Sequence, residues 1–358
     1  MIKTPLKKHK TIKAIGLMSG TSLDGLDIAA VEFRFAGNRW IYHLLEAETI
    51  AYPKTWKNRL ETAPQLSKNE LTLLNTKYGS YLGEQIQKFI QKTKFAPDLI
   101  ASHGHTIFHR PDLGYTLQIG NGATIASATN TITVADFRSL DVAKGGQGAP
   151  LVPIGDRLLF GEYDYCLNLG GFANISFEQD GLRRAFDVCP VNIVLNQFAE
   201  KLGKPFDKNG DLGKLGKLHK NVLDKLNALP YYRQLAPKSL GREWMEETFL
   251  PVIQAQQINE YDILRTVYEH IAIQLTNSVS GTGKMLITGG GAFNSFLIER
   301  IKNYTSTQLV LPDPNLINFK EALVFAFMGV LRMLEEKNCL ASATGAKSDS
   351  CCGEVFAP

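Results

Sequence analysis

Three glycine turns, each preceded by an apolar strand pattern, are the first residues in this chain that could do chemistry. They are Gly20-Thr21-Ser22, Gly170-Gly171 and Gly289-Gly290-Gly291. Backbone N–H groups in tight turns can hold phosphate without a lysine-bearing loop. Asp24 follows the first turn and could orient Mg²⁺ through water. Any one of these turns alone could be an ordinary hairpin or helix-end glycine, but the three in this order predict two phosphate turns and a flat surface for adenine.

Candidate acid–base and ligand-binding groups lie in two further segments. Asp187, in the segment AFDVCPVN, could be a general base, or merely an anion at the start of the helix that follows. His103 and His105, in SHGHT, could donate hydrogen bonds to a polar ligand. A metal site that includes His109 is disfavoured, because no further Cys, Asp or Glu joins them at ligand spacing.

Several other site types are excluded by single residues. Lys284 is followed by Met285 rather than Ser or Thr, so Gly281–Lys284 is no Walker A loop. The GGQGAP run follows no convincing strand, which argues against a dinucleotide-binding turn. The series Asp207, Asn209 and Asp211 imitates a calcium loop, but it lacks the turn glycine and the bidentate carboxylate. We expect a solvated turn there.

The elements that must position these groups alternate between strands and helices, which predicts an α/β protein. A strand–turn–strand over 12–33 is echoed by a second over 166–176, which suggests a duplicated domain. Ser67 and Glu70 form a capping box that opens a helix over 67–94. A short strand over 99–102 would deliver His103 and His105 at its C-terminal end. Further strands are expected at 116–119, 132–135 and 284–288, and further helices at 192–202, 261–279, 292–301 and 321–334.

Composition fits an ordinary globular chain. It has 358 residues, 44% hydrophobic and 21% charged, with a net charge of +4, which permits an anionic ligand but does not argue for nucleic acid. No apolar run could cross a membrane, and Met1–Lys13 is expected to be a frayed tail, not a secretory signal. Five cysteines at irregular spacing indicate a reduced, cytoplasmic protein, with Cys351 and Cys352 expected as exposed thiols.

The segment GLMSGTSLDGLDIA resembles the anhydro-N-acetylmuramic acid kinase family of bacterial cell-wall recycling. The resemblance runs from about 15 to 353 and includes SHGHTIFHRP, TLQIGNG, ADFRSLDVAKGGQGAPLVP, LNLGGFANIS, FDVCPVN, PKSLGREW, ITGGGAFN and SATGA. It implies duplicated ribonuclease H-like domains of the actin/hexokinase/Hsp70 type, with ATP in the cleft between them. We expect one domain over 11–136 with 318–358 and the other over 137–317.

The resemblance also implies a reaction and roles for residues. Water attacks C1 of 1,6-anhydro-N-acetylmuramic acid, the anhydro bridge opens, and O6 takes the γ-phosphoryl group of ATP, giving N-acetylmuramic acid 6-phosphate and ADP. Asp187 matches the family's general base, and Glu321 matches a glutamate at the start of a late helix that faces the active site. Sugar contacts are implied for His103, His105, Gln147 and Asn192, and Mg²⁺ for Asp24. The implied ATP contacts are Gly20, Thr21, Ser22, Leu23, Asp24, Gly25, Leu26, Asp27, Gly170, Gly171, Gly289, Gly290 and Gly291.

Two departures from the family pattern affect fine geometry. Cys189-Pro190-Val191 stands where the family often has Gly-Pro-Gly, and His105 stands where it has an amide. Val191 cannot use the backbone conformations open to glycine, whereas His105 still donates a hydrogen bond. Two alternatives stay open: a kinase of another amino sugar, and an ATP-driven module like actin or Hsp70 with no sugar acceptor. The expected partners are the sugar and ATP, without nucleic acid or membrane, and a homodimer is left open.

Overall fold

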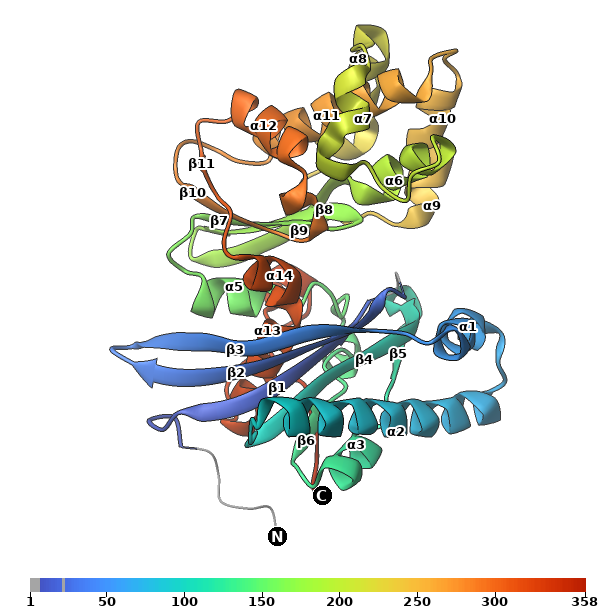
Figure 1. Ribbon diagram of the computed structural model, residues 1–358. Helices are drawn as coiled ribbons and strands as arrows, with labels where there is room; N and C mark the ends of the chain where they lie inside the picture. The colour runs from blue at the N-terminus through green and yellow to red at the C-terminus, as the bar shows by residue number, and fades with distance from the viewer. Residues whose placement is uncertain (1–6, 21–22) are drawn as a thin grey trace. The chain divides into compact units, whose positions relative to one another are not determined.

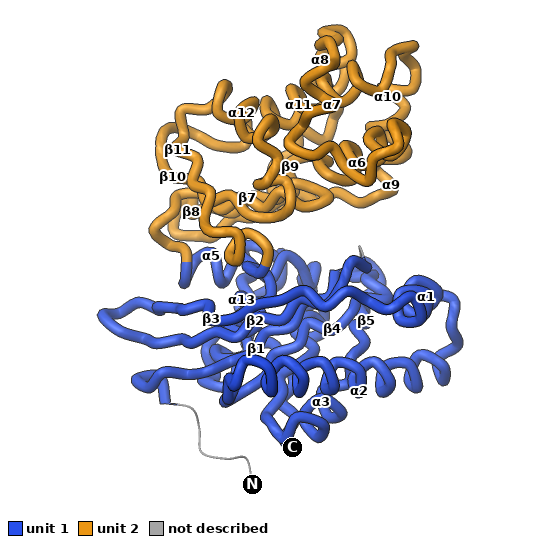
Figure 2. Tube along the Cα trace, viewed as in Figure 1, with its two compact units in different colours: residues 1–159, 319–358 blue, residues 160–318 orange. Residues whose placement is uncertain are grey.

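The chain forms two compact units, 1–159 with 319–358 and 160–318 (Figure 2). The computed structural model describes residues 7–20 and 23–358. Part of the expected N-terminal tail, and Thr21 and Ser22 of the first turn, therefore lie outside the described residues. Within the described ranges, no helix combines the length and apolar character needed to span a membrane.

The first unit is built on a sheet whose strands run in the order β12-β6-β4-β1-β2-β3, with β5 paired to β4 (Figure 1). β1, β2 and β3 form an antiparallel meander, and β4 and β6 add in parallel beside β1. The predicted strand–turn–strand over 12–33 is confirmed, because Ile12 pairs with Phe33 and Ser19 with Leu26. The strands are β1 Ile12–Ser19, β2 Gly25–Ala36, β3 Arg39–Ala51, β4 Leu99–Arg110, β5 Tyr115–Ile119, β6 Thr133–Ala135 and β12 Glu354–Phe356.

Helices pack on both faces of this sheet. α2 begins after the predicted capping box, with Ser67 and Glu70 each satisfying the other's backbone N–H, and ends at Lys94 in a left-handed conformation. On the opposite face, an added Cβ at Gly16 of β1 would collide with the Ala322 carbonyl of α13, so glycine is required for this close approach. The helices are α1 Lys54–Thr62, α2 Lys68–Thr93, α3 Gly122–Thr129, α4 Ser139–Ala143, α5 Pro153–Leu159, α13 Pro314–Met333 and α14 Ala341–Thr344.

The second unit repeats the strand order of the first. Its sheet runs β11-β10-β7-β8-β9, again a three-stranded antiparallel meander with two parallel strands added beside its first strand. This correspondence confirms the duplicated α/β fold. The strands are β7 Tyr165–Leu169, β8 Phe172–Gln179, β9 Leu182–Pro190, β10 Lys284–Thr288 and β11 Gln308–Val310.

The core of the second unit forms between this sheet and long apolar helices. Phe198, Tyr268 and Leu275 are buried with Leu167 and Ile175 of the sheet in one cluster. α11 starts at a capping residue, Asn259, whose side chain accepts from the Asp262 backbone N–H. The α-helices of this unit are α6 Asn192–Lys201, α7 Asp211–Leu215, α8 Lys220–Asn227, α9 Arg242–Trp244, α10 Leu250–Gln254, α11 Glu260–Asn277 and α12 Ser295–Tyr304.

The unit boundary differs from the expected one. We expected the second domain to begin at 137, but residues 137–159 belong to the first unit. Asp141 explains this, because its buried carboxylate accepts from Thr344 Oγ1 at 2.8 Å, Cys339 Sγ at 3.1 Å and the Gly148 N–H at 2.8 Å. These bonds tie the glycine-rich loop over 144–150 to the C-terminal segment of its own unit.

The expectation of two exposed terminal thiols is wrong for Cys352. This residue has no exposed surface, and its backbone N–H donates to the Asn338 side chain at 2.6 Å. Cys351 is half-buried. β12, which follows them, pairs with β6 and so draws the end of the chain into the sheet.

Candidate functional site

In the first unit, the predicted phosphate turn joins β1 to β2. Asp24 is exposed, whereas Asp27 is half-buried in β2 and accepts from Thr49 Oγ1 at 2.6 Å. Burial raises the pKa of Asp27, and the nearby charge of Asp24 adds to that rise. Because the two carboxylates repel each other, a cation beside them would be favoured.

Glu321 belongs to the same acidic neighbourhood. It lies well inside α13, not at a helix start as expected, because the helix already begins at Pro314. Burial raises the pKa of Glu321; the charges of Lys320 and Arg138 oppose this, and those of Asp27 and Asp156 reinforce it. Lys320 Nζ forms a buried ion pair with Asp156 Oδ1 at 2.6 Å.

A magnesium ion would fit this neighbourhood. Among the described residues, no three His, Cys, Asp or Glu side chains lie close enough to hold a metal by themselves. Mg²⁺ is commonly bound by one or two carboxylates together with substrate phosphates and water. Asp24 and Asp27, with their hard oxygen atoms and mutual repulsion, match that pattern.

The two histidines lie within β4 rather than at the end of a shorter strand, since β4 continues to Arg110. His105 is buried, and its Nδ1 lies 2.8 Å from Ser19 Oγ at the end of β1. Tyr52 donates to the same Ser19 oxygen at 2.7 Å and lies 2.6 Å from the Tyr78 hydroxyl. Burial lowers the pKa of His105 to about 4, so the ring is neutral near pH 7.

His103 is held differently. Its Nδ1 lies 2.9 Å from the Gly104 carbonyl, and its Nε2 accepts from Arg138 Nε at 3.0 Å. Burial and the Arg138 charge both lower the pKa of His103 well below its ordinary value. Since both ring nitrogens are engaged by protein groups, His103 positions Arg138. Gln147 is exposed in the glycine-rich loop, where its backbone N–H donates to Thr344 at 2.8 Å.

In the second unit, the Gly170–Gly171 turn joins β7 to β8 and abuts the start of α6. The Gly171 carbonyl accepts from the N–H groups of Val191 at 2.8 Å and Ile193 at 3.2 Å, and the Gly170 carbonyl from Asn192 at 3.2 Å. The N–H groups of the same two glycines donate to no backbone acceptor in the described chain. They remain available for an anion.

The third glycine turn meets this one at the carboxyl ends of the parallel strands β7 and β10. An added Cβ at Gly289 would lie 2.5 Å from Asn168 Oδ1, and one at Gly291 would lie 2.7 Å from Leu169 Cβ. Gly290 has open space, with Asn192 Nδ2 the nearest atom at 3.8 Å. Two of the three glycines therefore permit packing against β7, and only Gly290 offers backbone to a ligand.

Beside Gly290 is a pocket of about 200 Å³. Phe206 and Phe293 line it although 53% and 46% of their surfaces are exposed, so two flat aromatic rings are available to an occupant. Asn192, Asn196 and Asn294 add amides. Flat apolar walls with a few amides suit a heterocyclic base.

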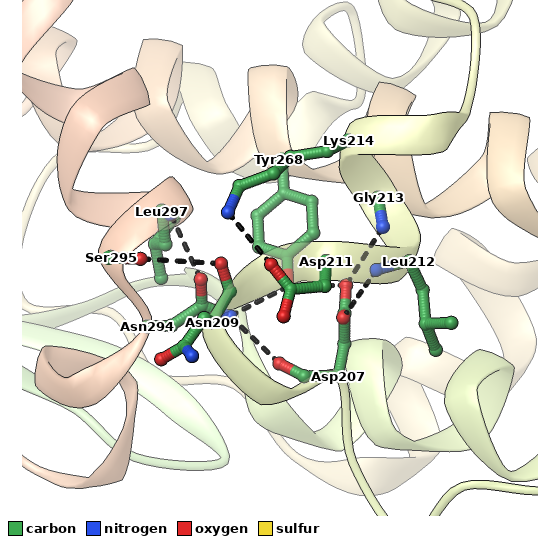
Figure 3. A network of polar contacts seen from close by, with 10 residues as sticks. All are labelled: Asp207, Asn209, Asp211, Leu212, Gly213, Lys214, Tyr268, Asn294, Ser295 and Leu297. Carbon is green, nitrogen blue, oxygen red and sulfur yellow. Dashed lines mark hydrogen bonds and ion pairs between the residues drawn. The ribbon is translucent and has the colours of Figure 1, made fainter.

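Four residues that line this pocket, Asp207, Asn209, Tyr268 and Asn294, belong to one polar network (Figure 3). The Asp207 carboxylate accepts from the N–H groups of Leu212 at 2.8 Å and Gly213 at 3.0 Å, and from the Tyr268 hydroxyl at 2.9 Å. Asn294 Nδ2 donates to that hydroxyl at 2.7 Å. The expected solvated turn is therefore wrong at Asp207, which is only 4% exposed and connects α7 and α11 to the glycine turn.

Asp187 lies on β9, paired with Asn174 of the strand that starts after the Gly170–Gly171 turn. Its Oδ2 accepts from the Leu240 N–H at 2.9 Å, and its backbone carbonyl accepts from the Tyr231 hydroxyl at 2.5 Å. Burial raises the pKa of Asp187 to about 6, with the Leu240 bond opposing the rise. A carboxylate with its pKa near the working pH is suited to accept a proton.

Sequence reasoning predicted the glycine turns and Asp187 as site residues, and the structure adds residues that contact them. Arg138, Tyr231 and Leu240 position the predicted residues, yet they carry no local signal, because their partners lie far away in the sequence. The exposed pair Phe206 and Phe293 could be found only once the fold placed them around one pocket.

Known proteins match this chain along nearly its whole length. The family model of anhydro-N-acetylmuramic acid kinase matches residues 12–358. A relative of that name from Pseudomonas putida is 36% identical, covering 88% of this chain and 91% of the relative. Another from Caldanaerobacter subterraneus is 33% identical, covering 95% and 96%. A solved structure, component A of the (R)-2-hydroxyglutaryl-CoA dehydratase of Acidaminococcus fermentans, matches at 12% identity with a TM-score of 0.46, covering 90% of this chain and 99% of that one.

Proposed function

The chain belongs to the anhydro-N-acetylmuramic acid kinase family, and from that premise we propose that Asp187 is the base of an ATP-dependent ring-opening phosphorylation. The substrate is 1,6-anhydro-N-acetylmuramic acid, and the products are N-acetylmuramic acid 6-phosphate and ADP. One observation carries the role of Asp187: its half-buried carboxylate is held by the Leu240 N–H, one strand from the Gly170–Gly171 turn. This geometry supports a base that acts beside bound phosphate.

In the proposed reaction, Asp187 accepts a proton from water as the water oxygen bonds to C1. The C1–O6 bond breaks, and O6 bonds to the γ-phosphorus while the bond to ADP breaks. The departing O6 is captured by phosphorus, so no separate acid is needed to protonate it. A mechanism without a separate acid fits phosphoryl transfer, in which the enzyme contributes positioning and charge stabilisation more than covalent catalysis.

We assign ATP to the glycine turns. The free N–H groups of Gly170 and Gly171 support phosphate binding, and the pocket beside Gly290 supports binding of the adenosine moiety. Asp24 and Asp27 would hold Mg²⁺, which neutralises charge on the phosphates when bound. Glu321 remains our proposed second carboxylate of the reaction site.

His105 is a better candidate than His103 for a direct hydrogen bond to the sugar. The Nδ1 of His105 is used by Ser19, and its Nε2 has no hydrogen-bond partner in the described part of the chain. His103 would act through Arg138. Gln147 and Asn192 remain proposed sugar contacts. The use of ATP and the five free thiols support a cytoplasmic location.

The decisive experiment is turnover in ¹⁸O-labelled water. The mechanism expects one label at C1 of the sugar and none in the new phosphate ester, with one ADP formed for each opened ring. ADP alone should support no hydrolysis. Label in the ester, or unphosphorylated N-acetylmuramic acid as the main product, would show that hydrolysis and transfer are separate and would remove the role given to Asp187.

A further inference from the structure

A second pocket in the 160–318 unit is left unused by the proposed reaction. It has a volume of about 390 Å³ and lies between β8, β9, the segment 232–238 and the C-terminal end of α11. It shares no lining residue with the pocket beside Gly290. Its wall includes Arg184 and Phe186, which alternate with Asp187 along β9, so the pocket opens on the other face of that strand.

The charge of this pocket is one-sided. Arg184 and Lys238 line it, and no Asp or Glu of the described chain does. Within the described residues, the Arg184 side chain makes no hydrogen bond or ion pair, although its backbone pairs with Phe177 of β8. Among the described residues, Lys238 Nζ donates to the Tyr231 carbonyl at 3.3 Å and lies over the rings of Tyr231 and Phe186, at 4.7 and 5.4 Å from their centroids. Burial lowers the pKa of Lys238, which shows that its ammonium is partly desolvated without a carboxylate to compensate.

The neutral part of the wall suits a hydroxylated ligand. The exposed side chains of Gln179 and Asn277 offer amide donors and acceptors, whereas Gln274 is buried and its Nε2 donates to Asn227. Phe177, Phe186 and Tyr232 offer apolar ring surface. Amides can bond sugar hydroxyls, while rings can cover the C–H face of a sugar. The volume lies within the range of small-molecule sites.

We propose that this pocket binds an anionic sugar, with Arg184 and Lys238 facing its carboxylate or phosphate oxygens. The product of the proposed reaction carries both kinds of anion, which makes it the first ligand to test. An occupant would touch the segment that holds the base, because Leu240 donates to Asp187 only two residues after Lys238. The binding claim itself needs no turnover.

The test is calorimetric titration of the full chain with N-acetylmuramic acid 6-phosphate. Wild type should bind two equivalents, one at the reaction site and one in this pocket. In Arg184→Gln the affinity of this pocket should fall at least ~10-fold, as expected for losing a charge-assisted bond, so that the titration detects one equivalent. Arg233→Gln is the matched control, because Arg233 is an exposed cation of the same segment that does not line the pocket. That variant should keep both equivalents.

Three further ligands identify the anion that is recognised. N-acetylmuramic acid carries only the carboxylate, N-acetylglucosamine 6-phosphate only the phosphate, and N-acetylglucosamine neither; at least one anionic sugar should bind in an Arg184-dependent way and the neutral one should not. A single equivalent in wild type, or two in a folded Arg184→Gln protein with an unchanged melting temperature, would overturn the proposal. Arg184-dependent binding by a protein that fails to open the anhydro sugar would instead overturn only the proposed function.

Discussion

Replacing Asp187 with asparagine should separate catalysis from binding. The amide oxygen of asparagine can still accept from the Leu240 N–H, which now meets Asp187 Oδ2 at 2.9 Å, so the local structure should persist. The amide cannot take a proton from water. Because general base catalysis contributes about 10²–10⁴-fold, we expect Asp187→Asn to lower turnover by at least ~10², with ATP binding retained.

The pH dependence follows from the same carboxylate. With a pKa of about 6, roughly ten ionised molecules of Asp187 exist for each protonated one at pH 7. The rate of the wild type should therefore fall about tenfold per pH unit below pH 6. The residual rate of Asp187→Asn should lack this acid limb.

Stability should change in the opposite direction. The pKa of Asp187 is raised above its ordinary value of 3.8, so the stabilisation from the protonated group is present below about pH 4 and is lost as pH rises through 6. Removing the carboxylate should therefore raise the free energy of unfolding at pH 7, by about 1–3 kcal/mol. Asp187→Asn is expected to be a slower but more stable protein.

The assay combines steady-state turnover between pH 5 and 8, nucleotide titration and thermal unfolding at pH 4 and pH 7. Glu178→Gln, an exposed carboxylate in the neighbouring strand β8, serves as a matched control and should keep wild-type turnover and its acid limb. Near-wild-type turnover of Asp187→Asn, or an acid limb that survives the substitution, would refute the assignment and move the role to Glu321.

Four further substitutions test the nucleotide site and the network beneath it. Asp24→Ala should weaken Mg·ATP binding or abolish turnover with unchanged melting temperature, because Asp24 is exposed; unchanged calorimetric affinity and kinetics would make it only a turn residue. Gly291→Ala should lower the melting temperature because its Cβ would meet Leu169, whereas Gly290→Ala should fold normally and raise the KM for ATP; equal stability loss in both would contradict the packing. Asp207→Ala leaves the Leu212, Gly213 and Tyr268 donors without their acceptor and should cost about 2–4 kcal/mol in denaturant unfolding, while an unaffected midpoint would refute the role of this network.

Local patterns in the sequence were enough to predict about half of the helices and strands; β3, β9 and the short helices α7 to α10 were not predicted. The hairpins over 12–33 and 166–176, the capped helix that starts after Ser67 and the strand Lys284–Thr288 depend on alternation, turn residues and caps, which act over a few residues. The motifs likewise predicted the family, which the family model confirms, and a role for Asp187, which stays a prediction. Elements were misjudged where long-range pairing extended them: β4 runs on to Arg110 because β5 pairs with its second half.

The tertiary structure alone decided burial and partners. Asp207 reads as a turn residue in sequence, yet the hydroxyl of Tyr268, 61 residues away, makes it a buried acceptor. The first unit includes residues 137–159, whose Asp141 bonds Cys339 and Thr344, some 200 residues later in the chain.

The protonation state of the site residues also depends on the tertiary structure. The sequence determined that Asp187, His105 and Glu321 are present, and their motifs gave them roles. It did not determine that burial raises the pKa of Asp187 to about 6 or lowers that of His105 to about 4. Desolvation depends on which atoms surround a group in space, and those atoms come from segments that only the folded chain brings together.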